Sequence, residues 1–149
     1  MKNIIVTTSV KTTSQLNTKA QNLANELNLK YIIRNKKTIK QLLESSQGVL
    51  VVYKNKLSYF ENDSEFFFHL DTTALKIKNS DNEPLVEIID KEKQKVLDCT
   101  MGLAGDSILL SYYGHNVTSL EKNKIIHIIT SNGLKNYVSP NKEIKKAMR

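Results

Sequence analysis

The residues with the clearest capacity for chemistry lie between positions 96 and 106, in the segment VLDCTMGLAGD. Asp98 closes an apolar run typical of a strand, and small residues follow it before a run with helical spacing. Small side chains let the backbone approach a ligand, and the first turn of a helix offers unpaired N–H groups. Glu121 closes the next predicted strand, where a carboxylate can accept hydrogen bonds from both hydroxyls of a ribose. The spacing therefore predicts a site for a nucleoside-type ligand.

This segment differs from the common dinucleotide and nucleoside triphosphate sites. The pattern G-x-G-x-x-G is absent, because Thr100 and Ala104 stand where glycines would be expected. Asp106, in the first helical turn, would repel a diphosphate but tolerate a cationic sulfonium ligand. The patterns G-x-x-x-x-G-K-[ST], G-x-S-x-G, C-x-x-C and H-E-x-x-H are also missing. The single cysteine, Cys99, excludes a Cys-rich zinc site, and we expect it to be a small buried residue and no metal to be bound.

In the second half of the chain, the predicted strands and helices alternate on both sides of residues 96–106. A short helix is predicted at 85–89, before the strand that ends in Asp98. Hydrophobic periodicity then predicts a helix at 106–113 that Gly114 ends, a strand at 117–120 and a helix at 124–137. This order is typical of a βαβ unit with parallel strands.

The first half of the chain has the same alternation. Strands are predicted at 4–6, 31–33 and 49–53, with helices at 15–29 and 39–44 between them. Ser14 and Thr38 are the expected N-caps of these helices. Two shorter strands, 56–60 and 66–70, are expected to form a hairpin, and Thr72 or Thr73 to cap a short helix after it. The polar stretch 78–83 before Pro84 predicts the boundary between an N-terminal α/β domain at 1–80 and a second domain at 84–149.

With these motifs in place, the chain resembles the class I S-adenosylmethionine-dependent methyltransferases. Residues 96–106 look like the family's glycine-rich first motif, in the form Asp-x-Thr-x-Gly-x-x-x-Asp found in a branch with rRNA methyltransferases and uncharacterised relatives. Residues 119–123 look like the second motif, whose acid holds the cofactor ribose. The resemblance is specific over 84–137 and looser over 1–83.

The resemblance implies an α/β fold, in which a small N-terminal α/β unit precedes the first βαβ part of a Rossmann-like methyltransferase core. It also implies S-adenosylmethionine as the cofactor. Asp98, Thr100 and Gly102 would line its methionine side, with residues 103–106 closing around it. The implied cofactor-binding residues are Asp98, Thr100, Gly102, Leu103, Ala104, Gly105, Asp106 and Glu121.

A complete core of this family has more strands than this chain shows, and its later motif with substrate and catalytic residues has no counterpart before Arg149. We therefore expect an N-terminal fragment that binds cofactor weakly, does not turn over alone and leaves the catalytic residues unknown. The strand at 95–98 would have an unpaired edge, which is prone to association. We expect the N-terminal half or a second copy of the chain to cover it, and predict a homodimer.

Charge points to a polyanionic partner. The chain has 22 Lys and Arg against 15 Asp and Glu, a formal charge of +7, with local concentrations at 34–40 and 142–149. Solvated surface is the favoured explanation of the composition taken alone, because lysine is a common surface residue and a nucleic-acid site needs a contiguous patch. RNA is the expected methyl acceptor; the alternative is a non-catalytic nucleic-acid-binding or interaction module on an α/β scaffold. No signal peptide or apolar membrane segment is evident, so a cytoplasmic location without membrane contact is expected.

Overall fold

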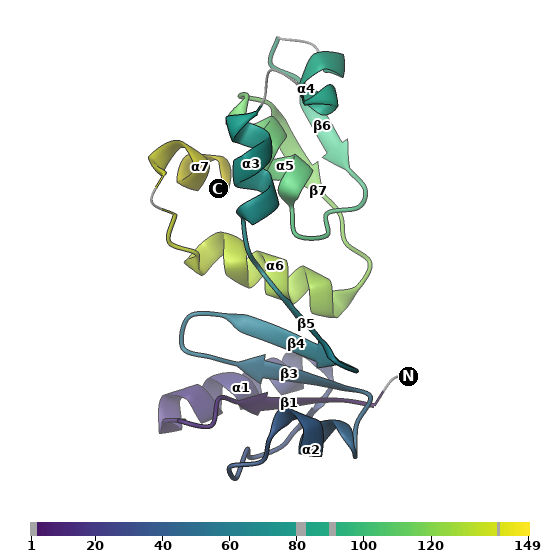
Figure 1. Cartoon of the computed structure of the whole chain (residues 1–149), viewed down its shortest axis with the longest axis vertical. Helices are drawn as coiled ribbons and strands as arrows, with labels where there is room; N and C mark the ends of the chain where they lie inside the picture. Colours follow the sequence, from purple (N-terminus) through teal and green to yellow (C-terminus); the bar gives the residue numbers. More distant parts are fainter. Residues whose placement is uncertain (1–2, 80–82, 90–91, 140) are drawn as a thin grey trace. The chain divides into compact units, whose positions relative to one another are not determined.

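The computed structural model describes residues 3–79, 83–89, 92–139 and 141–149. The chain forms two compact units, Met1–Phe68 and His69–Arg149. Each unit has its own β-sheet and its own helices (Figure 1). The predicted α/β class is therefore confirmed.

The first unit contains a five-stranded mixed sheet with the strand order β2-β1-β3-β4-β5. Its strands are β1 (Ile4–Thr8), β2 (Lys30–Tyr31), β3 (Gly48–Val52), β4 (Leu57–Glu61) and β5 (Ser64–Phe67). Strands β1, β2 and β3 are parallel, with Val6 opposite Leu50 in the central pair. Strands β4 and β5 are antiparallel to their neighbours, so the predicted parallel βαβαβ order and the predicted hairpin are both confirmed.

Two helices accompany this sheet, α1 (Ser14–Leu27) and α2 (Ile39–Leu43). The N-cap of α1 is Thr13 rather than the predicted Ser14, and Thr38 forms a capping box with Gln41 at the start of α2. The core on the α2 side consists of Ile5, Leu42, Val49 and Val51. Because side chains alternate along a strand, Val6 and Leu50 point to the opposite face, and both are fully buried. Strands buried on both faces are typical of parallel sheets.

The second unit contains a two-stranded parallel sheet, with Val96 opposite Val117. Its elements are α3 (Asp71–Lys78), α4 (Pro84–Ile88), β6 (Lys95–Asp98), α5 (Gly105–Tyr112), β7 (Asn116–Ser119), α6 (Lys124–Asn136) and α7 (Lys142–Ala147). The βαβ unit predicted for this region is therefore present as β6-α5-β7. Helix α5 packs against both α3 and α7 and buries Ile108 and Leu109 completely.

Several local predictions differ from the structure. Helix α3 packs against α5, so the two compact units divide between Phe68 and His69, earlier than the polar stretch at 78–83. Thr72 and Thr73 lie inside α3 rather than capping it, because the helix starts at Asp71. Cys99 is exposed, since the chain has already left the sheet there. Helix α7, capped by the Asn141 side chain, was not predicted.

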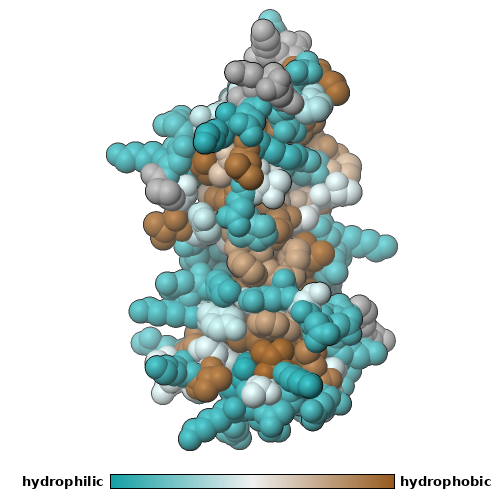
Figure 2. Space-filling model, in the orientation of Figure 1, coloured by the Kyte–Doolittle hydropathy of each residue, from teal (hydrophilic) through white to brown (hydrophobic). Residues whose placement is uncertain are grey.

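The sheet of the second unit is open among the described residues. No described strand pairs with the other edge of β6, and exposure alternates along both β6 and β7. Leu97 is 58% exposed and Leu120 is 52% exposed. In the space-filling view, hydrophobic side chains reach the surface and are interspersed with hydrophilic ones (Figure 2). In the described part of the chain, no helix has the length and hydrophobicity to span a membrane.

Candidate functional site

The candidate site lies where β6 and β7 end. Parallel strands bring their carboxyl ends to one edge of a sheet, which is where α/β folds bind ligands. The Leu120 N–H donates to the Asp98 carbonyl (2.7 Å), and the Met101 N–H donates to the Leu120 carbonyl (2.9 Å). These two bonds fix the loop after β6 over the end of β7.

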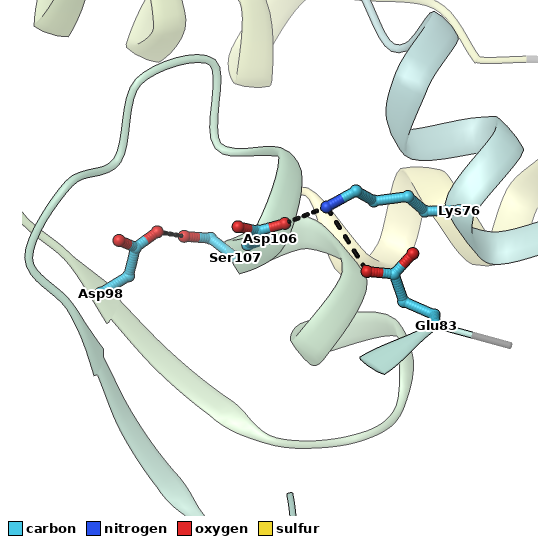
Figure 3. Close-up of polar contacts among 5 residues, drawn as sticks. All are labelled: Lys76, Glu83, Asp98, Asp106 and Ser107. Atoms are coloured by element: carbon cyan, nitrogen blue, oxygen red, sulfur yellow. Dashed lines mark hydrogen bonds and ion pairs between the residues drawn. The ribbon is translucent and has the colours of Figure 1, made fainter. Parts of the chain in front are cut away.

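The Asp98 carboxylate is held from two directions. One oxygen accepts from the Thr100 N–H (2.9 Å), and the other accepts from the Ser107 hydroxyl in α5. Ser107 Oγ also lies 2.8 Å from Ser119 Oγ at the end of β7. Figure 3 shows Asp98 and Ser107 facing each other between strand and helix. This chain of bonds orients the carboxylate before any ligand arrives.

The Glu121 side chain supports the same loop by accepting hydrogen bonds from backbone N–H groups. Its two carboxylate oxygens accept from the N–H groups of Gly102 (3.1 Å) and Asn123 (2.8 Å). The Gly102 carbonyl accepts from the Thr130 hydroxyl of α6 (2.6 Å). Gly102 has a φ of +52°, a conformation that favours glycine, and Ala104 adopts a similar φ of +60° where the first motif would have another glycine.

A hollow of about 200 Å³ opens beside this loop. The predicted residues in its wall are Asp98, Thr100, Leu103, Gly105 and Asp106. Gly102, Ala104 and Glu121 lie outside that wall. The structure therefore does not bring the two strand-end acids, Asp98 and Glu121, to one hollow, because the Glu121 carboxylate is turned to the loop backbone.

The other wall of the hollow comes from α3, which the motif-based prediction did not include. Thr72, Thr73 and Lys76 of α3 line it, together with His69 just before that helix and Met101 of the loop. The Lys76 ammonium lies 2.7 Å from Asp106 Oδ1, and this hydrogen bond is the main cause that raises the pKa of Lys76. No short motif joins Lys76 to residues 98–106, so only the packing of α3 on α5 identifies it.

Comparison with known proteins identifies the family. The family described as "Putative SAM-dependent methyltransferase" matches residues 22–149, most of the chain. The chain belongs to this family. It is 32% identical over 154 aligned residues to the "Uncharacterized protein YpiP" of Bacillus subtilis (strain 168), covering 97% of this chain and 60% of the relative.

A solved structure shows the same fold. The SAM-dependent methyltransferase NGO1261 from Neisseria gonorrhoeae matches with a TM-score of 0.61 and 14% identity, over 97% of this chain and 56% of that one. The chain thus spans somewhat more than half the length of both similar proteins. The predicted resemblance to class I methyltransferases is confirmed by the family match.

Membership of this methyltransferase family implies S-adenosylmethionine as the cofactor. The residues of the hollow fit that molecule chemically. Asp98 would supply a carboxylate for its ammonium charge and Asp106 one for its sulfonium charge. Met101 and Leu103 would supply apolar contact for its aliphatic chain. Among the described residues, His, Cys, Asp and Glu form no group of three that could hold a metal ion.

Proposed function

We propose that this chain carries part of the cofactor site of an S-adenosylmethionine-dependent methyltransferase. The observation that carries the proposal is the convergence of Asp98, Thr100 and Asp106 on one hollow at the end of a parallel β6-α5-β7 unit. Its volume of about 200 Å³ is below the roughly 300–1,000 Å³ typical of small-molecule pockets. A hollow of this size holds one end of the cofactor and leaves the rest to other residues.

The protein's contribution to such a reaction is positioning. S-adenosylmethionine supplies an electrophilic methyl group on a sulfonium sulfur. Asp98, oriented by Ser107 and the Thr100 N–H, would accept hydrogen bonds from the ammonium group of the methionine end. Asp106, in the first turn of α5, would face the sulfonium charge. Fixing the donor in this way raises the rate of transfer to a nucleophile, because the reacting atoms are held in line.

Calorimetry with S-adenosylhomocysteine tests the cofactor site. Asp98→Asn keeps an acceptor for Ser107 but removes the charge, and we expect it to weaken binding about tenfold or more. Glu121→Gln should weaken it less, because Glu121 acts on the loop backbone. Asp63→Asn, in an exposed turn of the first unit, is the matched control. Equal binding by Asp98→Asn and Asp63→Asn would contradict the proposal.

We further propose RNA as the methyl acceptor. A hollow of about 430 Å³ lies between α6 and α7, and its wall contains three cations and no acid. Its residues are Ser131, Leu134, Lys135, Lys145, Met148 and Arg149. Two of the three cations, Lys145 and Arg149, belong to the basic concentration at 142–149. This cluster therefore supports a contiguous phosphate-binding surface on a chain of formal charge +7.

Fluorescence polarisation with a labelled single-stranded RNA tests the acceptor. Lys135→Gln with Arg149→Gln should weaken binding and lower the magnitude of the salt slope by about 1.4, since two phosphate contacts to a single strand are lost. Lys19→Gln, exposed on α1 of the first unit, is the control. RNA binding without any response to S-adenosylhomocysteine would instead favour the non-catalytic module.

A further inference from the structure

Lys76 is the one cation in the wall of the cofactor hollow as the structure describes it, and it lies between two acids. Its Nζ is 2.7 Å from Asp106 Oδ1 and 3.5 Å from Glu83 Oε1. Figure 3 shows the ammonium between the two carboxylates, with Asp106 on α5 and Glu83 just before α4. The side chains of Lys76 and Glu83 are 31% and 17% exposed, whereas that of Asp106 is 58% exposed, so a ligand can reach the Asp106 carboxylate from solvent.

The positive charge of Lys76 opposes the binding of a cation by the acids of the hollow. Asp98 and Asp106 attract a cation, whereas Lys76 already neutralises Asp106 and repels a second positive charge. Hydrogen bonding to Asp106 raises the pKa of Lys76, so Lys76 is charged at neutral pH. A ligand that carries an additional positive charge must therefore compete with Lys76 for Asp106.

Glu83 provides another partner for the same lysine. It already lies within ion-pair distance of Lys76 Nζ, and the intervening bonds of a lysine side chain rotate readily. Movement of the ammonium from Asp106 toward Glu83 frees the Asp106 carboxylate without leaving Lys76 unpaired. Both arrangements keep the ammonium paired with a carboxylate.

We propose that Lys76 is a displaceable counter-ion of Asp106, which moves to Glu83 when a cationic ligand binds and so sets the discrimination between S-adenosylmethionine and S-adenosylhomocysteine. The inference rests on the proposed function. The two ligands differ by one methyl group and one charge: in transfer, the methyl leaves sulfur without the bonding electron pair, and a neutral thioether remains. After transfer Lys76 returns to Asp106. Lys76 is thus a specificity-determining residue of the site.

Binding of the two ligands to Lys76→Met, measured by calorimetry, tests this role. Removal of the competing charge should tighten S-adenosylmethionine binding about three- to tenfold and change S-adenosylhomocysteine binding less than about twofold. Lys78→Met is the matched control, since it removes the same charge from the same helix outside the hollow. Glu83→Gln should have the opposite effect, weakening S-adenosylmethionine more than S-adenosylhomocysteine.

A double variant shows whether Lys76 acts through Asp106. Lys76→Met should change the ratio of the two affinities less in an Asp106→Asn background than in the wild type. Thermal denaturation of each variant without ligand checks that it is folded. Equal weakening of the binding of both ligands by Lys76→Met would overturn the inference. It would indicate that Lys76 supports the structure of the site or contacts the ligand carboxylate. An unchanged ratio would also overturn it.

Failure of the proposed function has a different signature. If the wild-type chain binds neither ligand, the cofactor site itself is rejected and Lys76 has no such role. If the wild type binds both and Lys76→Met preserves their ratio, the cofactor site stands and only the counter-ion role is rejected.

Discussion

The two units bury their sheets to different extents. In the first unit every residue of β3 is buried, as is every residue of β1 after Ile4. In the second unit the residues of β6 and β7 alternate between exposed and half-buried, and no residue of either strand is fully buried. The first sheet is therefore buried through its central strands β1 and β3, whereas in the second sheet neither strand is buried and neither outer edge pairs with another described strand.

This difference shows what holds each unit together. The first unit depends on apolar burial, for which a single core side chain contributes a large share of the stability. The second unit also buries apolar side chains, such as Leu109 and Ile129 of its helices. At the end of its sheet, however, polar bonds of Asp98, Gly102 and Ser107 tie the loop to the helices. A site that binds a polar ligand needs this kind of support, because it holds acceptors in place while leaving them accessible.

The largest expected effect contrasts the two sheets directly. Leu50→Ala in β3 should lower the free energy of unfolding of the first unit by about 3 kcal/mol, since Leu50 is fully buried. Leu97→Ala in β6 should change that of the second unit by less than about 0.5 kcal/mol, since Leu97 is exposed. Urea denaturation followed by circular dichroism measures both. Similar losses would mean that the β6 face is covered in solution.

A smaller effect is expected where polar bonds replace apolar burial. Ser107→Ala removes the hydroxyl that bridges Asp98 and Ser119, and should cost the second unit about 1–2 kcal/mol. Ser111→Ala on the same helix, for which no side-chain hydrogen bond is described, should cost less than about 0.5 kcal/mol. Urea denaturation of both variants checks the difference. Equal stabilities would show that the Asp98 bridge contributes nothing.

The pH dependence of stability tests the contribution of burial in the first unit. Burial, followed by the charge of Glu61 and the hydrogen bond to it, raises the pKa of Tyr59 to about 12. The folded unit keeps this proton while the unfolded chain loses it near pH 10, so stability present below pH 10 should fall as pH rises toward 12. Tyr59→Phe should flatten that decline in thermal melts. A residual slope is expected from Tyr53, whose pKa is also raised by burial.

The smallest expected effect concerns self-association at the open β6 edge. We propose that a second copy of the chain pairs there, and expect a weak dimer in sedimentation velocity at micromolar concentration. Leu97→Lys places a charge on the edge strand and should give a monomer, because edge lysines oppose strand pairing. Val138→Lys, at an exposed position outside the sheet, should leave the dimer intact. A monomeric wild type would contradict the expectation.

Much of the fold follows from local patterns in the sequence. The β-branched run at 49–52, the helical spacing at 15–27 and the Thr38 capping position all predict the elements that form. Element ends are less predictable. Thr13 and not the adjacent Ser14 caps α1, and neither Thr72 nor Thr73 caps α3, because that helix starts before them. Helix α7 has only six residues, too short for a clear hydrophobic period.

The sequence by itself determined the family, the βαβ order and the turn that carries Asp98, Gly102 and Asp106, because short-range spacing encodes strands, helices and tight turns. Only the tertiary structure decided which side chains share the hollow. It turned Glu121 toward the loop backbone and brought Lys76 of α3 against Asp106, thirty positions away. Such pairings depend on which helix packs against which, and that packing is a sum of many weak contacts that no local motif records.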